Sequence, residues 1–84
     1  MPEYISAEIL HWAVVLADKQ GFSVAAQKLQ IDPSVLRAQI HELSTRIGCH
    51  IFEEMEDRVE LTEGGKALIQ AVRGYLVWLE KQKK

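Results

Sequence analysis

The chain has 84 residues, enough for one domain, and its 48% hydrophobic content excludes an intrinsically disordered protein. The formal net charge of −2 is unusual for a nucleic-acid-binding domain, because such domains are generally basic. The longest apolar runs, such as residues 12–17, are too short to cross a bilayer, so no membrane partner is expected.

The first predicted helix begins after Ser6, whose hydroxyl can cap the unpaired N–H groups of the first turn. It continues to about Lys19, and Gly21 is expected to end it. Apolar residues at helical spacing predict which face of this helix is buried. They are Ile9, Trp12, Ala13, Leu16 and Ala17.

A short second helix is predicted over residues 24–29. Ser23 would be its N-cap, and Phe22 would pack as an apolar staple just before the cap. The helix contains the small residues Ala25 and Ala26, which allow a neighbouring helix to approach closely. A tight turn over residues 30–32 then leads into the third helix.

Residues 31–48 contain both the start and the end of that third helix. Asp32 is a good N-cap, Pro33 suits the first helical position, and Gly48 suits the left-handed residue that ends a helix. One face carries an apolar stripe at spacings of four, three and four, made of Leu36, Ile40, Leu43 and Ile47. The opposite face is small, polar or cationic, and consists of Ser34, Arg37, Ala38, His41 and Thr45.

Two interpretations fit this third helix when it is taken alone. It is either an ordinary surface helix or a helix whose outer face enters the major groove of DNA. The helix before it and the short turn between them favour the second interpretation, because together they make a helix-turn-helix arrangement.

The periodicity changes after Gly48. Residues 51–54 and 58–61 are predicted to be two short strands around a turn, and Val59 and Leu61 alternate with charged residues. This hairpin would be the wing of a winged helix. Residues 53–60 contain five acidic residues against one arginine, so the predicted wing is strongly acidic.

Thr62 is predicted to cap a long last helix that runs from Glu63 to about Lys81. Its apolar positions follow a heptad-like seam that continues past the point where so small a domain can cover it. The predicted dimer interface is therefore Leu68, Val72, Tyr75, Leu76 and Leu79. The alternative is that this strip folds back over the first helix. We predict a winged helix-turn-helix domain over residues 1–61 and a dimerisation helix over residues 62–84.

Several short motifs follow one another along the chain: Gly-Phe-Ser, Ala-Ala-x-x-Leu, a helix ending in Ile-Gly, Ile-Phe, and Leu-Thr-x-x-Gly. In this order the chain resembles the N-terminal DNA-binding domain of LysR-type transcriptional regulators. The resemblance implies a mainly α fold, a winged helix-turn-helix of three helices with a two-stranded wing and a long C-terminal linker helix that pairs two domains. The matching residues are Gly21-Phe22-Ser23, Ala25-Ala26, Leu29, Ile31, Gln39-Ile40, Leu43, Ile47-Gly48, Ile51-Phe52, Leu61-Thr62 and Gly65.

The chain departs from the family where that family contacts DNA. Where this chain has Pro33, the family usually has a polar residue, and where it has Arg37 and Ala38, the family has Ser and then Arg. Where this chain has Ser44 and Glu54, the family usually has Glu and a basic residue. Moving the arginine by one residue turns it by about 100° around the helix. An acidic wing would repel phosphates, which dominate DNA affinity. These departures weaken the usual DNA-binding face.

The resemblance implies a homodimeric transcription regulator that binds double-stranded operator DNA. The residues expected to contact bases or phosphates are Ser23, Lys28, Pro33, Ser34, Arg37, Ala38, His41, Arg46 and Arg58. The alternative function is a winged-helix module that binds a protein partner through its acidic wing and binds DNA weakly or not at all. Because full-length family members carry a ligand-sensing domain after the long helix, the chain is expected to be either an excised domain or a small protein without its own effector switch.

Nothing in the sequence predicts an enzyme, a metal site or a cofactor. The three histidines and Cys49 lack the spacing of zinc ligands, and Ser23 and Ser34 lack a partner constellation for nucleophilic catalysis. A single cysteine excludes an internal disulfide. The N-terminus lacks the basic-then-apolar layout of a signal peptide, so a cytoplasmic location is expected.

Overall fold

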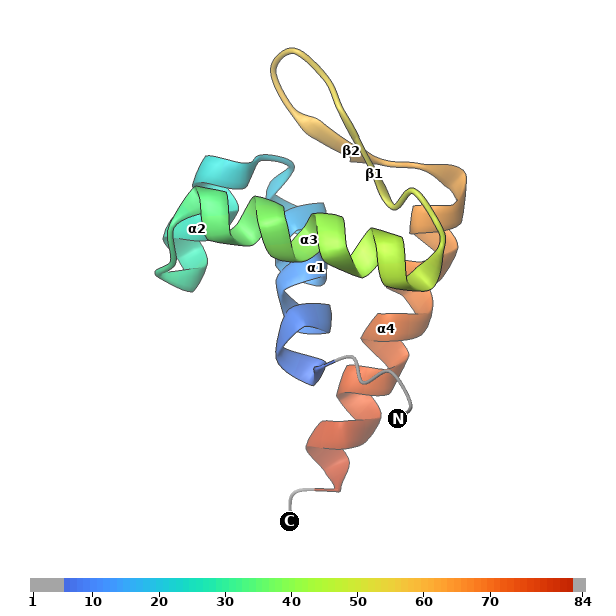
Figure 1. The fold of residues 1–84 in the computed structure, drawn as a ribbon. Coiled ribbons are helices and arrows are strands. Elements are labelled where there is room, and N and C mark those ends of the chain that lie inside the picture. The colour runs from blue at the N-terminus through green and yellow to red at the C-terminus, as the bar shows by residue number, and fades with distance from the viewer. Residues whose placement is uncertain (1–5, 83–84) are drawn as a thin grey trace.

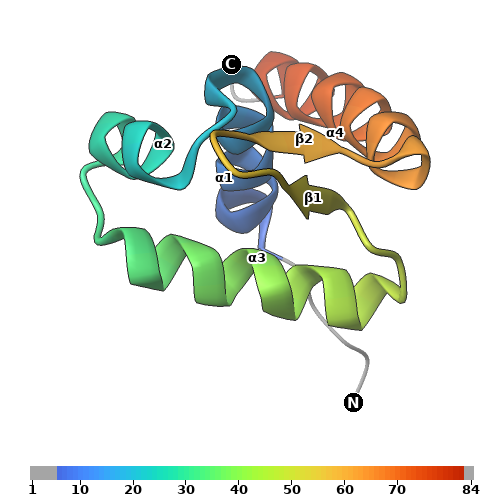
Figure 2. The same cartoon turned by 90° about the horizontal axis from the view of Figure 1, so that it is seen from above.

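The computed structural model describes residues 6–82 as four helices and a two-stranded antiparallel sheet (Figure 1). The order is α1 (Ala7–Lys19), α2 (Phe22–Leu29), α3 (Pro33–Ile47), β1 (Phe52–Glu54), β2 (Val59–Leu61) and α4 (Glu63–Lys81). Helix α1 is central and packs against α2, α3, α4 and β2. Figure 2 shows α3 along one side of the molecule, with β1 beside it and α1 behind. The predicted mainly α winged helix-turn-helix with a long last helix is confirmed.

The helix starts follow the predicted capping chemistry at three of the four helices. Ser6, Asp32 and Thr62 each accept a hydrogen bond from a backbone N–H of the first turn, at 3.0, 2.8 and 2.9 Å. The side chain and backbone of Ser34 both donate to Asp32, and these bonds lower the pKa of the Asp32 carboxyl. Gly48 ends α3 in the left-handed conformation with φ 76°, as predicted.

The junction between α1 and α2 differs from the prediction. The left-handed residue that ends α1 is Gln20, with φ 60°, and not Gly21. Gly21 is the N-cap of α2, and its carbonyl accepts from the N–H of Ala25 at 3.0 Å. The prediction of Ser23 as N-cap is therefore wrong, because α2 begins at Phe22 and Ser23 lies inside its first turn. The apolar face of α2 starts at Phe22, which is itself packed against the core.

The hydrophobic core draws on every part of the fold. The largest fully buried side chains are Leu16 from α1, Leu36 from α3 and Ile51 from the segment before β1. Helix α4 contributes Ile69 and Val72, which are 2% and 6% exposed. The core therefore crosses the predicted division between residues 1–61 and 62–84.

The wing is tied to the rest of the domain from its base to the end of its strands. The register pairs Phe52 with Leu61, Glu53 with Glu60, and Glu54 with Val59. On its outer edge, the N–H of Val59 donates to the carbonyl of Gln20 at 2.9 Å. Because Phe52 and Val59 are buried while Glu53 and Glu54 are exposed, the hairpin is anchored by its apolar residues and projects its acidic residues.

Candidate nucleic-acid interface

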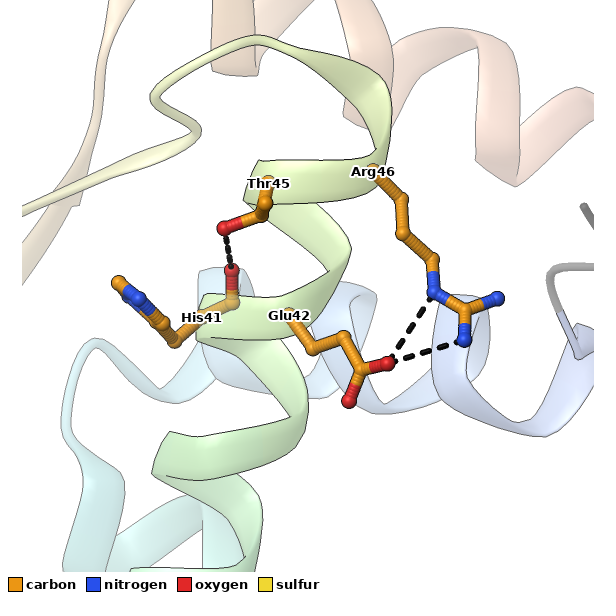
Figure 3. Close-up of polar contacts among 4 residues, drawn as sticks. All are labelled: His41, Glu42, Thr45 and Arg46. Atoms are coloured by element: carbon orange, nitrogen blue, oxygen red, sulfur yellow. Dashed lines mark hydrogen bonds and ion pairs between the residues drawn. The ribbon is translucent and has the colours of Figure 1, made fainter.

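Helix α3 presents two different polar faces to solvent. On one face, the hydroxyl of Thr45 donates to the carbonyl of His41 at 3.1 Å. On another, the guanidinium of Arg46 donates to the carboxylate of Glu42 through Nε at 3.2 Å and Nη2 at 2.9 Å. Figure 3 shows these pairs on different sides of the helix. The face with His41 and Thr45 therefore combines small uncharged groups with an imidazole, while the other carries an ion pair.

The face of α3 with His41 and Thr45 forms one wall of an open groove, which we call the trough. Its volume is about 620 Å³. Phe52 and Glu54 of β1 form the opposite wall, and residues 48–50 join the two walls. Four predicted base-contacting residues line the trough together, namely Ser34, Arg37, Ala38 and His41. The structure thus places these side chains between α3 and the wing.

Arg37 crosses the trough and is held by two side chains from other elements. Its Nη1 donates to Oε2 of Glu54 on β1 at 2.5 Å. Its Cζ lies 4.3 Å from the centre of the Phe22 ring at the start of α2, a cation–π contact. We call these three residues the Arg37 clamp. The hydrogen bond from Arg37 holds the pKa of the Glu54 carboxyl below its usual range and raises the pKa of the Arg37 guanidinium.

Arg58 is also engaged by carboxylates, within the wing itself. Its Nε donates to Glu60 at 2.5 Å and its Nη1 to Asp57 at 3.0 Å. The bond to Glu60 and the nearby negative charge raise the pKa of Arg58. Glu60 also lies opposite Glu53 in the hairpin, where two like charges repel each other. Arg58 therefore offsets repulsion inside the wing, and a phosphate would compete with two carboxylates for it.

The remaining predicted contacts lie outside the trough. Pro33 is exposed at the first position of α3, and Ser23 and Lys28 are exposed on α2. Arg46 points away from the trough-facing side of α3 (Figure 3). The predicted set is thus spread over the α2–α3 end of the molecule, α3 and the wing.

Sequence reasoning missed two residues of this site. Phe22 was expected only as a staple, and Glu54 only as an unfavourable charge in the wing. The signal for Glu54 was its acidic character at a position where the resembled family has a basic residue. Its partner is 17 residues away in sequence, so the pairing depends on how the hairpin folds over α3.

The end of α4 carries the second candidate contact surface. Among the residues predicted for a dimer interface, Tyr75 is 46% exposed, Leu68, Leu76 and Leu79 are half-buried, and Val72 is covered by the chain's own core. Trp78 is 55% exposed, and its ring stacks on that of Tyr75 with the centroids 6.3 Å apart. Val72 is therefore unavailable to a second copy, whereas Tyr75 and Trp78 are accessible.

Residues 6–82 contain neither a cluster of metal ligands nor a helix suited to a membrane. Within residues 6–82, no three His, Cys, Asp or Glu side chains gather closely enough to hold a metal ion. None of the helices among those residues, the 19-residue α4 included, is long and apolar enough to cross a membrane.

Comparisons with known proteins agree with this architecture. Residues 8–66 match the family described as bacterial regulatory helix-turn-helix proteins of the lysR family. The chain is 32% identical over 73 residues to the HTH-type transcriptional regulator DsdC of Escherichia coli. It is 35% identical over 72 residues to the HTH-type transcriptional regulator TfdT of Cupriavidus pinatubonensis. These alignments cover 87% and 86% of this chain but only 24% and 32% of the relatives.

Solved structures show the same fold. The DNA-binding domain of BenM, in complex with catB site 1 DNA, is 26% identical and has a TM-score of 0.89. That match covers 93% of this chain and 87% of the BenM chain. The CbnR DNA-binding domain, also in a DNA complex, has a TM-score of 0.89 at 20% identity, covering 93% of this chain and 90% of that one, which shows the fold alone. The chain belongs to the LysR family of bacterial regulatory helix-turn-helix proteins and has the fold of their DNA-binding domain.

Proposed function

We propose that this chain binds double-stranded DNA sequence-specifically as the DNA-binding unit of a transcription regulator, and that it acts as a homodimer. The observation that carries the proposal is the exposed outer face of α3. Ser34, Ala38 and His41 lie there side by side with no bulky apolar group among them. A helix of this kind fits the major groove, where side chains reach the edges of bases.

The contacts divide into two groups. Ser34, Arg37, Ala38 and His41 would read base edges, and Pro33 would lie near the DNA backbone at the start of α3. The expected phosphate contacts are Ser23, Lys28, Arg46 and Arg58. Of these, Arg46 and Arg58 are engaged by carboxylates in the free protein, so each has to share or exchange its partner on binding.

The homodimer is supported by the exposed aromatic end of α4. Tyr75 and Trp78 present a stacked pair of rings, and Val77 on the same helix is 53% exposed. Contiguous exposed apolar surface marks an interaction site. Two copies joined antiparallel through α4 would hold two α3 helices at a fixed spacing along DNA and raise the affinity of a weakly charged domain.

A salt titration tests DNA binding directly. Fluorescence anisotropy would follow the chain added to labelled duplexes, first a random pool and then a duplex selected from it by the wild type. We expect the affinity to fall at least about tenfold between about 50 and about 200 mM salt, because phosphate contacts release counterions. Failure to bind any duplex at the lowest salt would reject the proposal.

Arg37→Ala tests the assignment of base contacts. The loss of binding free energy at the selected duplex should be about 1–3 kcal/mol if Arg37 makes a bidentate contact with guanine, and the loss on random DNA should be much smaller. An equal loss on both duplexes would assign Arg37 to phosphate instead.

A second function is favoured by one specific observation, which is that carboxylates engage Arg37, Arg46 and Arg58. Because these arginines are paired, the acidic residues of the hairpin dominate the charge of that surface. Such a surface suits a basic protein partner better than DNA. Replacing Glu53, Glu54 and Glu56 by Lys separates the two functions. The triple variant should bind DNA more tightly if the wing only tunes affinity. If the wing is a docking surface, the variant should lose capture of the partner in a pull-down.

A further inference from the structure

We infer that Glu54 sets the DNA affinity of this domain by holding Arg37 away from DNA in the free protein. The inference rests on the proposed DNA-binding function. It adds a positioning residue on the wing that acts through a base-contacting candidate on α3. Glu54 is thereby an internal competitor of DNA for the same guanidinium.

The contact is built from three separate elements. Arg37 of α3 donates to Glu54 of β1 at 2.5 Å, and the Phe22 ring of α2 lies 4.3 Å from Arg37 Cζ. The ring limits where the guanidinium can move, and the carboxylate aligns it across the trough. The clamp therefore directs Arg37 toward the wing wall rather than outward along α3.

The clamp is open to competition. The side chains of Arg37 and Glu54 are 54% and 53% exposed, so neither is sealed from solvent or from an approaching anion. A guanidinium has a planar set of N–H donors that fits a carboxylate, a phosphate or a guanine edge. Because all three ligands use the same donors, DNA can engage these donors fully only by displacing Glu54.

The energetic consequence has two parts. Exposed ion pairs of this kind contribute modestly to stability, so DNA can break this one. In addition, the released carboxylate remains beside the phosphates and repels them. Glu54 thus weakens DNA binding more than an acidic residue that is not paired with an arginine of the DNA-binding face.

Glu53 is the matched control. It precedes Glu54 on the same strand and carries the same charge, but successive side chains of a strand point to opposite faces. Phe52 and Glu54 line the trough and Glu53 does not. Replacing Glu53 by Gln removes one negative charge from the wing without touching the clamp.

The experiment compares five versions of the 84-residue chain: the wild type, Glu54→Gln, Glu53→Gln, Arg37→Ala, and the double variant with Arg37→Ala and Glu54→Gln. The probe is the labelled duplex that the wild type selects from the random pool, titrated from about 50 to about 200 mM salt. Glu54→Gln should bind about threefold more tightly than Glu53→Gln, which is the range of an exposed ion pair.

The double variant identifies the mechanism. Without Arg37, there is nothing for Glu54 to hold, so Glu54→Gln should gain no more affinity than the removal of one charge at Glu53 gives. Thermal unfolding of each chain excludes a folding defect as the cause of any difference.

Three results would overturn the inference. Equal affinities for Glu54→Gln and Glu53→Gln would show that only the net charge matters. An excess gain that persists without Arg37 would show that Glu54 acts by another route. In both cases the proposed function would stand, whereas a lack of binding by every chain at the lowest salt would overturn the function and the inference together.

Discussion

The two halves of α4 share one helix but lie in opposite environments. In the first half, Gly65, Ile69 and Val72 are buried against the wing base and the core. In the second half, Tyr75, Val77 and Trp78 are each about half exposed or more. Both halves have a similar spacing of apolar residues in the sequence. The difference shows that a continuous apolar stripe can serve two purposes, closing the domain first and then offering a surface to a partner.

Two glycines mark the same contrast. A Cβ added at Gly65 would overlap the backbone carbonyl of Ile51 and lie 3.2 Å from a methyl carbon of Leu61. A Cβ added at Gly74 would meet nothing within 4 Å. Gly65 is therefore required by close packing within the domain. Gly74 has no such role in the single chain, and it lies beside the exposed aromatic residues.

The largest expected effect comes from filling the tight contact in the first half. Gly65→Ala should lower the free energy of unfolding by about 3 kcal/mol, because the new methyl group pushes α4 away from the backbone before β1. Urea unfolding at a fixed chain concentration measures this loss. Gly74→Ala is the control in the same helix, and equal effects of the two changes would refute the contrast drawn between the halves.

A smaller effect is expected on self-association from charges in the second half. Leu76→Glu combined with Leu79→Glu should weaken dimerisation by about 100-fold, since carboxylates would be placed within the proposed apolar interface. Sedimentation equilibrium measures the change. A wild-type chain that stays monomeric at tens of micromolar, roughly the range of a modest interface, would contradict the dimer. A dimer that survives both substitutions would contradict this choice of surface.

Local sequence signals predicted most of the fold. Asp32, Pro33 and Gly48 define the ends of α3 by chemistry that operates within one turn, and Thr62 does the same for the start of α4. The start of α2 was missed because its N-cap, Gly21, has no side chain to give a signal. Ser23 is the stronger capping residue by type, but burial of Phe22 in the first turn determined where the helix begins.

The candidate site was predictable only in part. The outer face of α3 follows from helical periodicity, and four of its predicted residues do line the trough. The Arg37 clamp was not predicted, since it joins α2, α3 and β1 through tertiary packing. The role of Val72 was likewise ambiguous, because a heptad-like spacing describes a core face and a dimer seam equally well.

A modest gain is expected at Gly74. Gly74→Ala should stabilise the monomeric fold by about 1 kcal/mol, because alanine has the higher helix propensity and the added methyl group has free space. If two α4 helices approach closely at this position, the same methyl group should weaken the dimer. Chemical unfolding and sedimentation of one variant therefore separate these effects. A loss of monomer stability would mean that Gly74 is packed after all.

The smallest effect concerns the point where the two halves of α4 meet. Nη2 of Arg73 donates to Asp18 of α1 at 2.6 Å, between Val72 of the core and Leu76, which packs against the core. Both side chains are about half exposed, so the pair should contribute only about 0.2–1 kcal/mol. A double-mutant cycle with Arg73→Ala and Asp18→Ala measures this coupling, and added salt should reduce it. If the pair fixes the direction of the exposed half, breaking it should also weaken dimerisation while leaving the core intact. A coupling energy near zero with unchanged self-association would show that the packing of Ile69 and Val72 alone directs α4.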